Sequence, residues 1–222
     1  HQKFSLNIAT TRGCPFKCNW CAKPIYGNRY NSRTPVSVVE ELKLLMNNFG
    51  ATHFWVCDDI FGLKPGWVEA FSELLKKENL QPKLKIQCRA DLLLTENTIQ
   101  HLVNAGLDEV WMGAESGSQQ ILDAMDKGTQ VEQIAEATQL LKKFGVKVCF
   151  FLQYGYLGET KNDIDKTLNM VQQLLPHDIG ISVSYPLPGT VFYEKVKQQL
   201  QTKQNWTDSD DLAMLYQGNY SA

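Results

Sequence analysis

The sequence predicts an α/β fold, specifically a partial (β/α)6 TIM-like barrel. Strand-like and helix-like segments alternate along the whole chain, which is typical of a parallel sheet whose strands are joined by crossover helices. Six such units in 222 residues give about 37 residues per unit, whereas a closed barrel of eight units needs about 250 residues. The sequence therefore favours an open, right-handed arc of six units, with a doubly wound open sheet as the alternative.

Six segments are predicted as strands because they are short, apolar and rich in β-branched or aromatic residues. They are Ser5 to Thr10, His53 to Cys57, Lys83 to Cys88, Glu109 to Met112, Lys147 to Gln153 and Ile179 to Ser184. In both candidate folds, functional residues gather at the carboxyl ends of the strands. We therefore expect the site in the segments that directly follow these strands.

Five segments between the strands place apolar residues at helical spacing. They are Val36 to Phe49, Trp67 to Lys77, Thr98 to Ala105, Val131 to Phe144 and Thr160 to Leu175. Three of them stop at a glycine, and the last begins with a capping-box pattern, Thr160 to Asp163, and is followed by Pro176. We expect the apolar stripes of these helices to face the core.

Composition excludes several classes of protein. The chain has 43% hydrophobic residues and a formal net charge of -2, which excludes a disordered acidic tail, a collagen-like repeat and a strongly basic nucleic-acid-binding domain. Its longest apolar runs are strand-sized, far below the roughly 20 residues that a membrane helix needs. No signal peptide is visible at the N-terminus. We therefore expect no membrane span and no nucleic-acid partner.

Three cysteines lie within eight residues, directly after the first predicted strand, as Cys14-Pro-Phe-Lys-Cys18-Asn-Trp-Cys21. This compact loop can present three thiolates to one inorganic centre. Structural zinc usually has four ligands, and the sequence contains neither a second Cys-x-x-Cys pair nor a spaced histidine pair. A 4Fe-4S cluster normally takes four thiolates, so three would leave one iron with an open position, as in catalytic metal sites.

The other three cysteines, Cys57, Cys88 and Cys149, lie in separate strand-like runs. Free cysteine in such a run behaves as a small buried hydrophobic residue, and we expect this for all three. Reduced thiols beside a clustered trio indicate an intracellular protein with a metal site, and we expect it in the cytoplasm.

The cysteine spacing, with Trp20 as the aromatic residue before the third cysteine, resembles the Cys-x-x-x-Cys-x-aromatic-Cys hallmark of the radical S-adenosylmethionine (SAM) superfamily. The resemblance covers nearly the whole chain. It implies the partial barrel of the radical SAM core, with Cys14, Cys18 and Cys21 holding a 4Fe-4S cluster whose open iron binds SAM. It also implies that an electron from the cluster splits SAM into methionine and a 5′-deoxyadenosyl radical, which abstracts a substrate hydrogen.

Two strand ends carry charged residues that this resemblance connects with SAM. Asp58 and Asp59 follow the second strand, where the family holds the methionyl ammonium group, and paired carboxylates suit a cation at lowered dielectric constant. A helix-capping aspartate is the alternative. Arg89 follows the third strand and could bind a carboxylate bidentately. The alternative is an internal ion pair of Arg89 with Asp91 or Glu115.

The fourth strand is followed by Gly-Ala-Glu115-Ser116-Gly-Ser, which resembles the Glu-Ser-Gly segment of the family. The resemblance assigns Glu115 and Ser116 to the ribose and methionyl groups of SAM, and the glycines allow a close backbone approach.

The segment after the fifth strand is similar to the Gly-x-Pro-Gly-Glu-Thr turn of the family, with Leu157 in place of the proline. The resemblance assigns Gln153, Gly155 and Glu159 to the cofactor site. Glu159 could instead complement the dipole of the following helix. Pro186 follows the sixth strand, and by resemblance this segment packs against the adenine of SAM.

The last two strand-end segments and the tail at 206–212 are most similar to one branch of the family, the cobalamin-binding proteins related to the anaerobic magnesium-protoporphyrin monomethyl ester cyclase. This resemblance implies a radical SAM core domain over residues 1–200 and the start of a C-terminal extension over 201–222. It also implies an upstream cobalamin-binding domain in the full-length protein, outside this chain.

We therefore expect a radical SAM enzyme that acts on a small molecule, by a tetrapyrrole-type oxidative cyclisation or a cobalamin-dependent methylation. The cofactors would be the 4Fe-4S cluster, SAM and, in the full-length protein, cobalamin, with a low-potential electron donor such as flavodoxin or ferredoxin. One alternative is a tRNA-modifying methylthiotransferase, which the net charge of -2 does not favour. Another is a non-catalytic iron-sulfur electron carrier, which would need a fourth thiolate.

Overall fold

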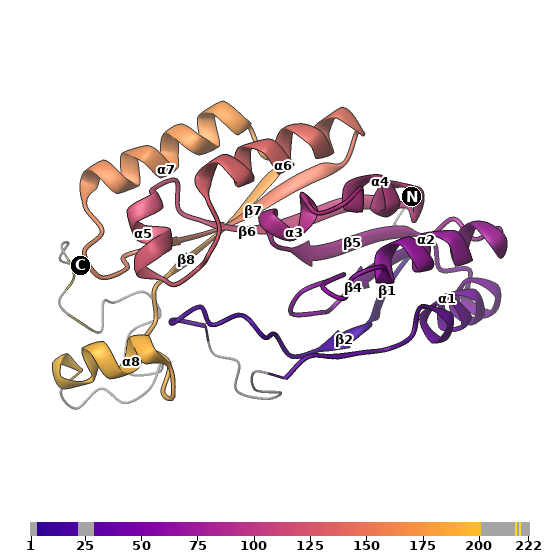
Figure 1. Cartoon of the computed structure of the whole chain (residues 1–222), viewed down its shortest axis with the longest axis horizontal. Helices are drawn as coiled ribbons and strands as arrows, with labels where there is room; N and C mark the ends of the chain where they lie inside the picture. The colour runs from indigo at the N-terminus through magenta and orange to yellow at the C-terminus, as the bar shows by residue number, and fades with distance from the viewer. Residues whose placement is uncertain (1–3, 22–28, 201–215, 217, 219–222) are drawn as a thin grey trace.

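The fold is organised around one parallel sheet. The computed structural model describes residues 4–21, 29–200, 216 and 218. Its six-stranded sheet has the order β1-β4-β5-β6-β7-β8, with every neighbouring pair parallel (Figure 1). The strands are β1 Ser5–Ile8, β4 His53–Val56, β5 Lys83–Cys88, β6 Leu107–Glu115, β7 Lys147–Tyr154 and β8 Asp178–Val183. Because the spatial order follows the chain order without reversal, the partial barrel is confirmed and the doubly wound sheet is excluded.

Helices follow the strands along the chain. They are α1 Pro35–Phe49, α2 Trp67–Lys77, α3 Ala90–Leu93, α4 Thr98–Asn104, α5 Gln119–Ala124, α6 Val131–Lys143, α7 Lys161–Leu174 and α8 Val191–Val196, with a 3-10 turn at Lys197–Gln199. Figure 1 shows α2, α3, α4, α6 and α7 on one side of the sheet, and α8 with β2 on the other side. The described part of the chain contains no helix long and apolar enough to cross a membrane.

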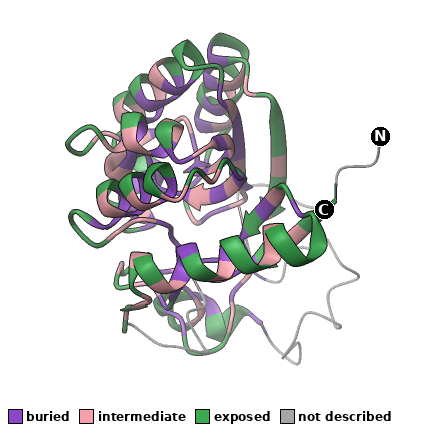
Figure 2. Ribbon diagram, turned by 90° about the vertical axis from the view of Figure 1, so that its right-hand side faces the viewer, coloured by how far each residue is buried: buried purple, intermediate pink, exposed green. Residues whose placement is uncertain are grey.

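The two faces of the sheet have different surroundings. On the face under the helices, Ile86, Val110 and Phe150 are fully buried and belong to the main core, and Figure 2 shows buried residues concentrated between the helices and the sheet. On the opposite face, Trp55 and Lys85 are paired neighbours on β4 and β5 and remain partly or largely exposed. Helices α2, α3, α4, α6 and α7 thus cover one face of the arc, whereas on its inner face side chains such as those of Trp55 and Lys85 stay partly exposed.

Local signals explain the ends of α1. The Thr34 hydroxyl accepts a hydrogen bond from the Ser37 amide at 3.2 Å, and Pro35 occupies the first helical position. Gly50 ends the helix with a left-handed φ of 65°.

Short elements escaped the sequence analysis. The structure adds the antiparallel pair β2 (Thr11–Arg12) and β3 (Asn31–Ser32), and the short helices α3 and α5. None is long enough for a periodic pattern. In addition, β6 begins at Leu107 and ends at Glu115, so it extends beyond the predicted Glu109 to Met112 at both ends. At its C-terminal end, the pairing with β7 continues past a register shift as far as Glu115.

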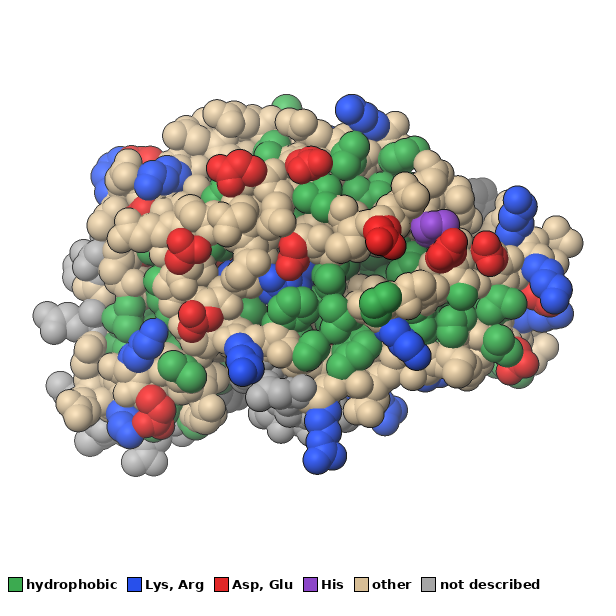
Figure 3. All heavy atoms as spheres, viewed as in Figure 1, with side chains coloured by type: hydrophobic (Ala, Val, Ile, Leu, Met, Phe, Trp, Pro, Cys, Tyr) green, Lys and Arg blue, Asp and Glu red, His purple; other side chains and the backbone are tan. Residues whose placement is uncertain are grey.

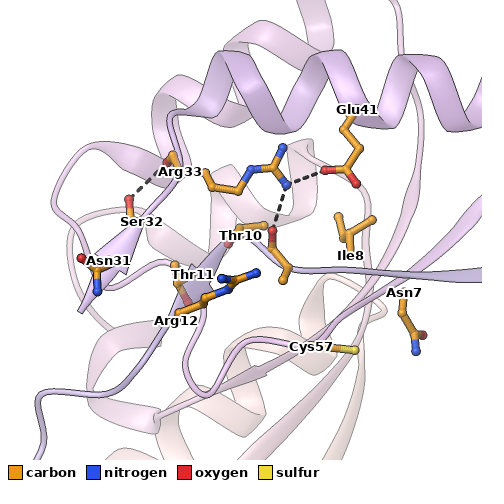
Figure 4. A pocket seen from close by; sticks show the side chains of 11 residues that line it. Asn7, Ile8, Thr10, Thr11, Arg12, Asn31, Ser32, Arg33, Glu41 and Cys57 are labelled. Carbon is orange, nitrogen blue, oxygen red and sulfur yellow. Dashed lines mark hydrogen bonds and ion pairs between the residues drawn. The ribbon is translucent and has the colours of Figure 1, made fainter. Parts of the chain in front are cut away.

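The isolated cysteines differ in their surroundings. Cys88 and Cys149 are buried as expected, and burial raises the pKa of Cys88 to about 12 and of Cys149 to about 11. The prediction is wrong for Cys57, which is exposed because β4 already ends at Val56. Figure 4 shows its thiol beside Asn7 in a separate pocket bounded by β1 and the β2–β3 pair.

The predicted capping box at the start of α7 is confirmed. The Asp163 carboxylate accepts hydrogen bonds from the Thr160 amide at 3.0 Å and the Thr160 hydroxyl at 2.6 Å. Its second oxygen accepts one from the Ser118 hydroxyl at 2.6 Å, which ties α7 to the segment after β6. These hydrogen bonds, first that from Ser118, hold the pKa of Asp163 well below its usual range.

We expect Asp163→Asn to lower the free energy of unfolding at pH 7 by about 1 to 2 kcal/mol. The folded-state pKa is lowered, so wild type keeps this stabilisation above the unfolded pKa of about 3.9 and loses it as pH falls further. The difference between wild type and variant should therefore shrink below pH 4 in urea titrations.

Asp165→Asn is the matched control, because Asp165 pairs with Lys161 at 2.7 Å on the exposed face of the same helix. It should change the stability by less than about 0.5 kcal/mol. Equal losses in both variants would contradict a special role for Asp163.

A candidate cofactor cavity at the strand ends

A cavity of about 310 Å³ lies at the carboxyl ends of the strands, within the size range of small-molecule sites. Its walls come from the cysteine loop after β1, the ends of β5 and β6, the inner faces of β7 and β8, and the segments after β4 and α5. The structure thus brings together residues from nearly the whole chain at the edge where functional residues were expected.

All three clustered cysteines line this cavity. Cys14, Cys18 and Cys21 are partly exposed free thiols, and the Cys21 amide donates to the Cys18 carbonyl at 3.3 Å. Among the described residues, no three His, Cys, Asp or Glu side chains are gathered as a preformed metal site. The three thiols thus line the wall of one cavity.

Trp20 provides a second test of whether a cofactor fits. Its side chain lines the cavity, yet its indole N–H is buried and has no hydrogen-bond partner among the described residues. Buried donors in native proteins are nearly always paired, so this N–H suits an acceptor on a bound group. Three soft thiol donors beside one unused N–H fit a cluster with a cofactor next to it.

The cysteine loop is anchored by Asn19, which sequence analysis missed. The Asn19 side-chain amide donates to the Ala124 carbonyl at 2.7 Å and to the Asp126 carboxylate at 2.9 Å. The Tyr156 hydroxyl donates a hydrogen bond to the side-chain oxygen of Asn19, Oδ1, at 2.6 Å. Asn19 is buried, so these bonds join the loop to the segments after β6 and β7. Its position inside the motif, between Cys18 and Trp20, was the only signal.

The two predicted aspartates after β4 have different roles. Asp59 lines the cavity, and its carboxylate accepts a hydrogen bond from the Gly13 amide at 3.1 Å. Asp58 does not line it. Its buried carboxylate accepts hydrogen bonds from the Thr10 amide at 2.7 Å, the Thr11 amide at 3.0 Å and the Thr10 hydroxyl. It therefore joins the ends of β1 and β4 instead of capping a helix, and burial raises its pKa against the opposing effect of these hydrogen bonds.

Arg89 lines the cavity and forms one of the internal ion pairs considered above. Its Nε and Nη2 atoms donate to the two Asp91 carboxylate oxygens at 2.9 and 3.0 Å, and Nη2 also donates to the Thr129 hydroxyl at 3.0 Å. The Nε and Nη2 atoms, which could bind a carboxylate of a ligand bidentately, are thus already bonded to Asp91.

Glu115 pairs with Lys127, which sequence analysis missed because it follows α5 and not a strand. Their side chains are 6% and 7% exposed, and Lys127 Nζ lies 2.7 Å from Glu115 Oε1. Glu115 has a left-handed φ of 59°, which is rare outside glycine and typical of functional sites. A Cβ on Gly113 would lie 2.7 Å from Lys127 Nζ and 2.8 Å from Glu115 Oε1, so a larger residue there would displace the pair.

Besides Asp58, five predicted site residues do not line this cavity: Ser116, Gln153, Gly155, Glu159 and Pro186. They stabilise the surrounding loops. Ser116 shares a hydrogen bond with Thr167 of α7 at 3.2 Å, and Gln153 donates to Ser184 at 3.0 Å. Glu159 accepts from the Gly155 amide at 2.6 Å, and burial raises the pKa of Glu159. Pro186 is buried in the segment after β8.

Aromatic side chains form the floor of the cavity on the inner face of the sheet. Trp111 and Phe151 both line it, with ring centroids 4.8 Å apart. Lys85 Nζ lies 5.0 Å from the centre of the Trp55 ring and 5.1 Å from that of Trp111. A Cβ on Gly180 would lie 3.2 Å from the Trp111 ring and 3.3 Å from the Phe151 ring, so glycine lets β8 approach these two rings closely. Both rings remain partly exposed. Figure 3 shows hydrophobic side chains gathered across the middle of the molecule.

Comparisons with known proteins agree on one family. Residues 8–171 match the Radical SAM superfamily. An uncharacterised methyltransferase of Pyrococcus horikoshii is 27% identical over 201 residues, which are 90% of this chain and 44% of the relative. The anaerobic magnesium-protoporphyrin IX monomethyl ester cyclase of Cereibacter sphaeroides is 28% identical over 193 residues, 86% of this chain and 32% of the relative.

A putative methylthiotransferase of Methanocaldococcus jannaschii is 30% identical over 199 residues, 84% of this chain and 43% of the relative. The chain thus spans between 32% and 44% of the length of these three relatives. Among solved structures, the radical S-adenosylmethionine methyltransferase TsrM from Kitasatospora setae, with cobalamin and a 4Fe-4S cluster bound, matches with a TM-score of 0.77 and 21% identity. That match covers 90% of this chain and 40% of TsrM, and it shows the same fold.

We expect Glu115→Gln and Lys127→Met each to destabilise the protein by about 3 to 5 kcal/mol, because either change leaves one buried charge without a partner. The double variant should be less destabilised than the sum of the two, as urea denaturation would measure. Lys147→Met is the control, since Lys147 pairs with Asp108 at 3.1 Å near the surface, and it should cost less than about 1 kcal/mol. Additive losses in the double variant would exclude a coupled pair.

Proposed function

This chain belongs to the radical SAM superfamily, and we propose that it forms the core of an enzyme in which Cys14, Cys18 and Cys21 hold a 4Fe-4S cluster that cleaves SAM. The observation that carries this proposal is the cavity itself, where the three thiols lie opposite a buried ion pair at the strand ends. When bound, the cluster supplies the electron that breaks a carbon–sulfur bond of SAM, which yields methionine and a 5′-deoxyadenosyl radical able to take a hydrogen atom from a substrate.

Four side chains in the cavity suit the groups of SAM. Lys127 presents a cation for the methionyl carboxylate, and Asp59 presents a carboxylate for the ammonium group. Glu115 holds Lys127 in place, and Trp20 offers an indole N–H that has no partner among the described residues. Around them, Asp58, Ser116, Gln153, Gly155, Glu159 and Pro186 would shape the loops that enclose the cofactor.

A fourth thiolate is not available for a closed cluster, which argues against a simple electron carrier. Cys88 also lines the cavity, but it is buried and donates to the Phe61 carbonyl at 3.6 Å. One iron of a cluster bound in this loop would therefore stay open for SAM.

The aromatic floor supports a small, largely apolar substrate. The partly exposed rings of Trp111 and Phe151 line the cavity and suit a flat conjugated molecule, which would stack on them next to the cluster. We propose either a tetrapyrrole-type oxidative cyclisation or a cobalamin-dependent methylation, in line with the names of the relatives. Cobalamin would be held by an upstream domain. In this chain, residues 1–200 would form the radical SAM core, and residues 201–222 would begin a C-terminal extension, most of which lies outside the described residues.

The relative from Methanocaldococcus jannaschii keeps methylthio transfer as a second candidate function. The two functions differ in their second cofactor, because a methylthiotransferase would need an additional cluster instead of cobalamin. Six free thiols favour a reducing compartment, so we propose the cytoplasm, with flavodoxin or ferredoxin as electron donor.

We expect Cys14→Ala, Cys18→Ala and Cys21→Ala each to abolish the visible absorbance of the cluster after anaerobic reconstitution with iron and sulfide. Each should also abolish the formation of 5′-deoxyadenosine from SAM under reducing conditions. Cys149→Ala is the control, because this thiol is buried outside the cavity and should be dispensable for both. A cluster that survives Cys18→Ala would refute the ligand assignment.

Asp59→Ala should weaken SAM binding by roughly tenfold or more, since an ammonium contact of about 1.5 kcal/mol or more is lost, while the iron content stays unchanged. Asp58→Ala should instead destabilise the junction of β1 and β4 by about 2 to 3 kcal/mol. Equilibrium dialysis with SAM and urea denaturation separate the two effects. Unaltered SAM affinity in Asp59→Ala would remove this residue from the site.

A further inference from the structure

Arg89 contacts the cysteine loop in a way that SAM binding does not require. Its Nη1 atom lies 3.9 Å from the Sγ atom of Cys18, within reach of a weak N–H to sulfur hydrogen bond. Its guanidinium carbon also lies 3.8 Å from the centre of the Phe16 ring, a close cation–π contact. One side chain at the end of β5 therefore touches two residues of the loop that carries the three thiols.

The orientation of this guanidinium is fixed by the protein. Asp91 holds Nε and Nη2 through two hydrogen bonds, and Thr129 holds Nη2 through a third. The Arg89 side chain is only 7% exposed. Because the bidentate edge is already used, Nη1 is the part of the guanidinium that is directed at the sulfur. The charge is thus placed before any cluster binds and needs no rearrangement.

Positive charge and N–H donors next to cluster sulfurs have a known physical effect. Reduction adds negative charge to a cluster, and its reduction potential rises when nearby donors and charges stabilise that form. The effect is strongest where water is excluded, as it is around a nearly buried arginine. The Asp91 carboxylate offsets part of this charge, but it binds the opposite edge of the guanidinium.

We propose that Arg89 is a positioning residue for the cluster. It holds the cysteine loop through Phe16 and Cys18, and its Nη1–H raises the reduction potential of the bound cluster. This inference rests on the proposed function, because it requires a cluster bound by Cys14, Cys18 and Cys21.

The test is a potentiometric titration of the reconstituted protein, with the reduced cluster followed by electron paramagnetic resonance and the iron content measured separately. Arg89→Met should lower both the share of protein that holds a cluster and the reduction potential of the clusters that remain. Arg89→Lys keeps the charge but cannot form the fork to Asp91 and Thr129, so its potential should lie between those of wild type and Arg89→Met.

Arg33→Lys is the matched control. Arg33 is also held in a fork, by the Ala9 carbonyl at 3.0 Å, the Ser37 carbonyl at 3.1 Å and Glu41, but it borders the separate pocket of Figure 4. This change should leave the potential of the cluster unaltered. The control thus separates the loss of an arginine fork in general from the loss of the contact with Cys18.

Two results would overturn the inference. One is an unchanged potential in both Arg89 variants, even with fewer clusters bound, which would make Arg89 a purely structural residue. The other is an equal shift in Arg33→Lys. If circular dichroism shows that Arg89→Met does not fold, the reduction potential of the cluster in Arg89→Lys decides: an unchanged potential in that variant overturns the inference. Failure of the wild-type protein to bind any cluster would instead refute the proposed function.

Discussion

The parallel pairing of six strands in chain order is the constraint on which the site depends. Because all strands run in one direction, their carboxyl ends meet at the same edge of the arc. Cys14, Arg89 and Glu115 follow or end three different strands, and this geometry alone brings them to one cavity. Helices α2, α3, α4, α6 and α7 cover the outer face (Figure 1), and the cavity borders the inner face at the strand ends.

Burial at this edge requires each charge to have a partner. Arg89 pairs with Asp91, Lys127 pairs with Glu115, and the Asp58 carboxylate takes N–H groups from the end of β1. The Asp58 contacts join segments that are distant in the sequence, so polar contacts as well as the aromatic floor shape the cavity. The Asp91 pair also directs the remaining Nη1 group of Arg89 toward the thiol of Cys18.

Adjacent residues within one motif have different roles. Asp59 lines the cavity while Asp58 braces the strand ends, and Glu115 lines it while Ser116 bonds to α7. The motifs indicated the correct segments, but the direction of each side chain follows from the backbone at the strand end. At Glu115 that backbone is left-handed, a conformation that its residue type does not predict.

Local patterns were sufficient for the order of strands and helices, for β5, α2 and the capping box of Asp163, and for the three cysteines that line the cavity. Periodicity, caps and motif spacing are properties of neighbouring residues, so they can be read from the chain directly. The partners of Lys127, Asn19 and Arg89 depend on contacts between distant segments. Burial decides which of these polar groups must pair, and burial exists only once the sheet has brought the strand ends together.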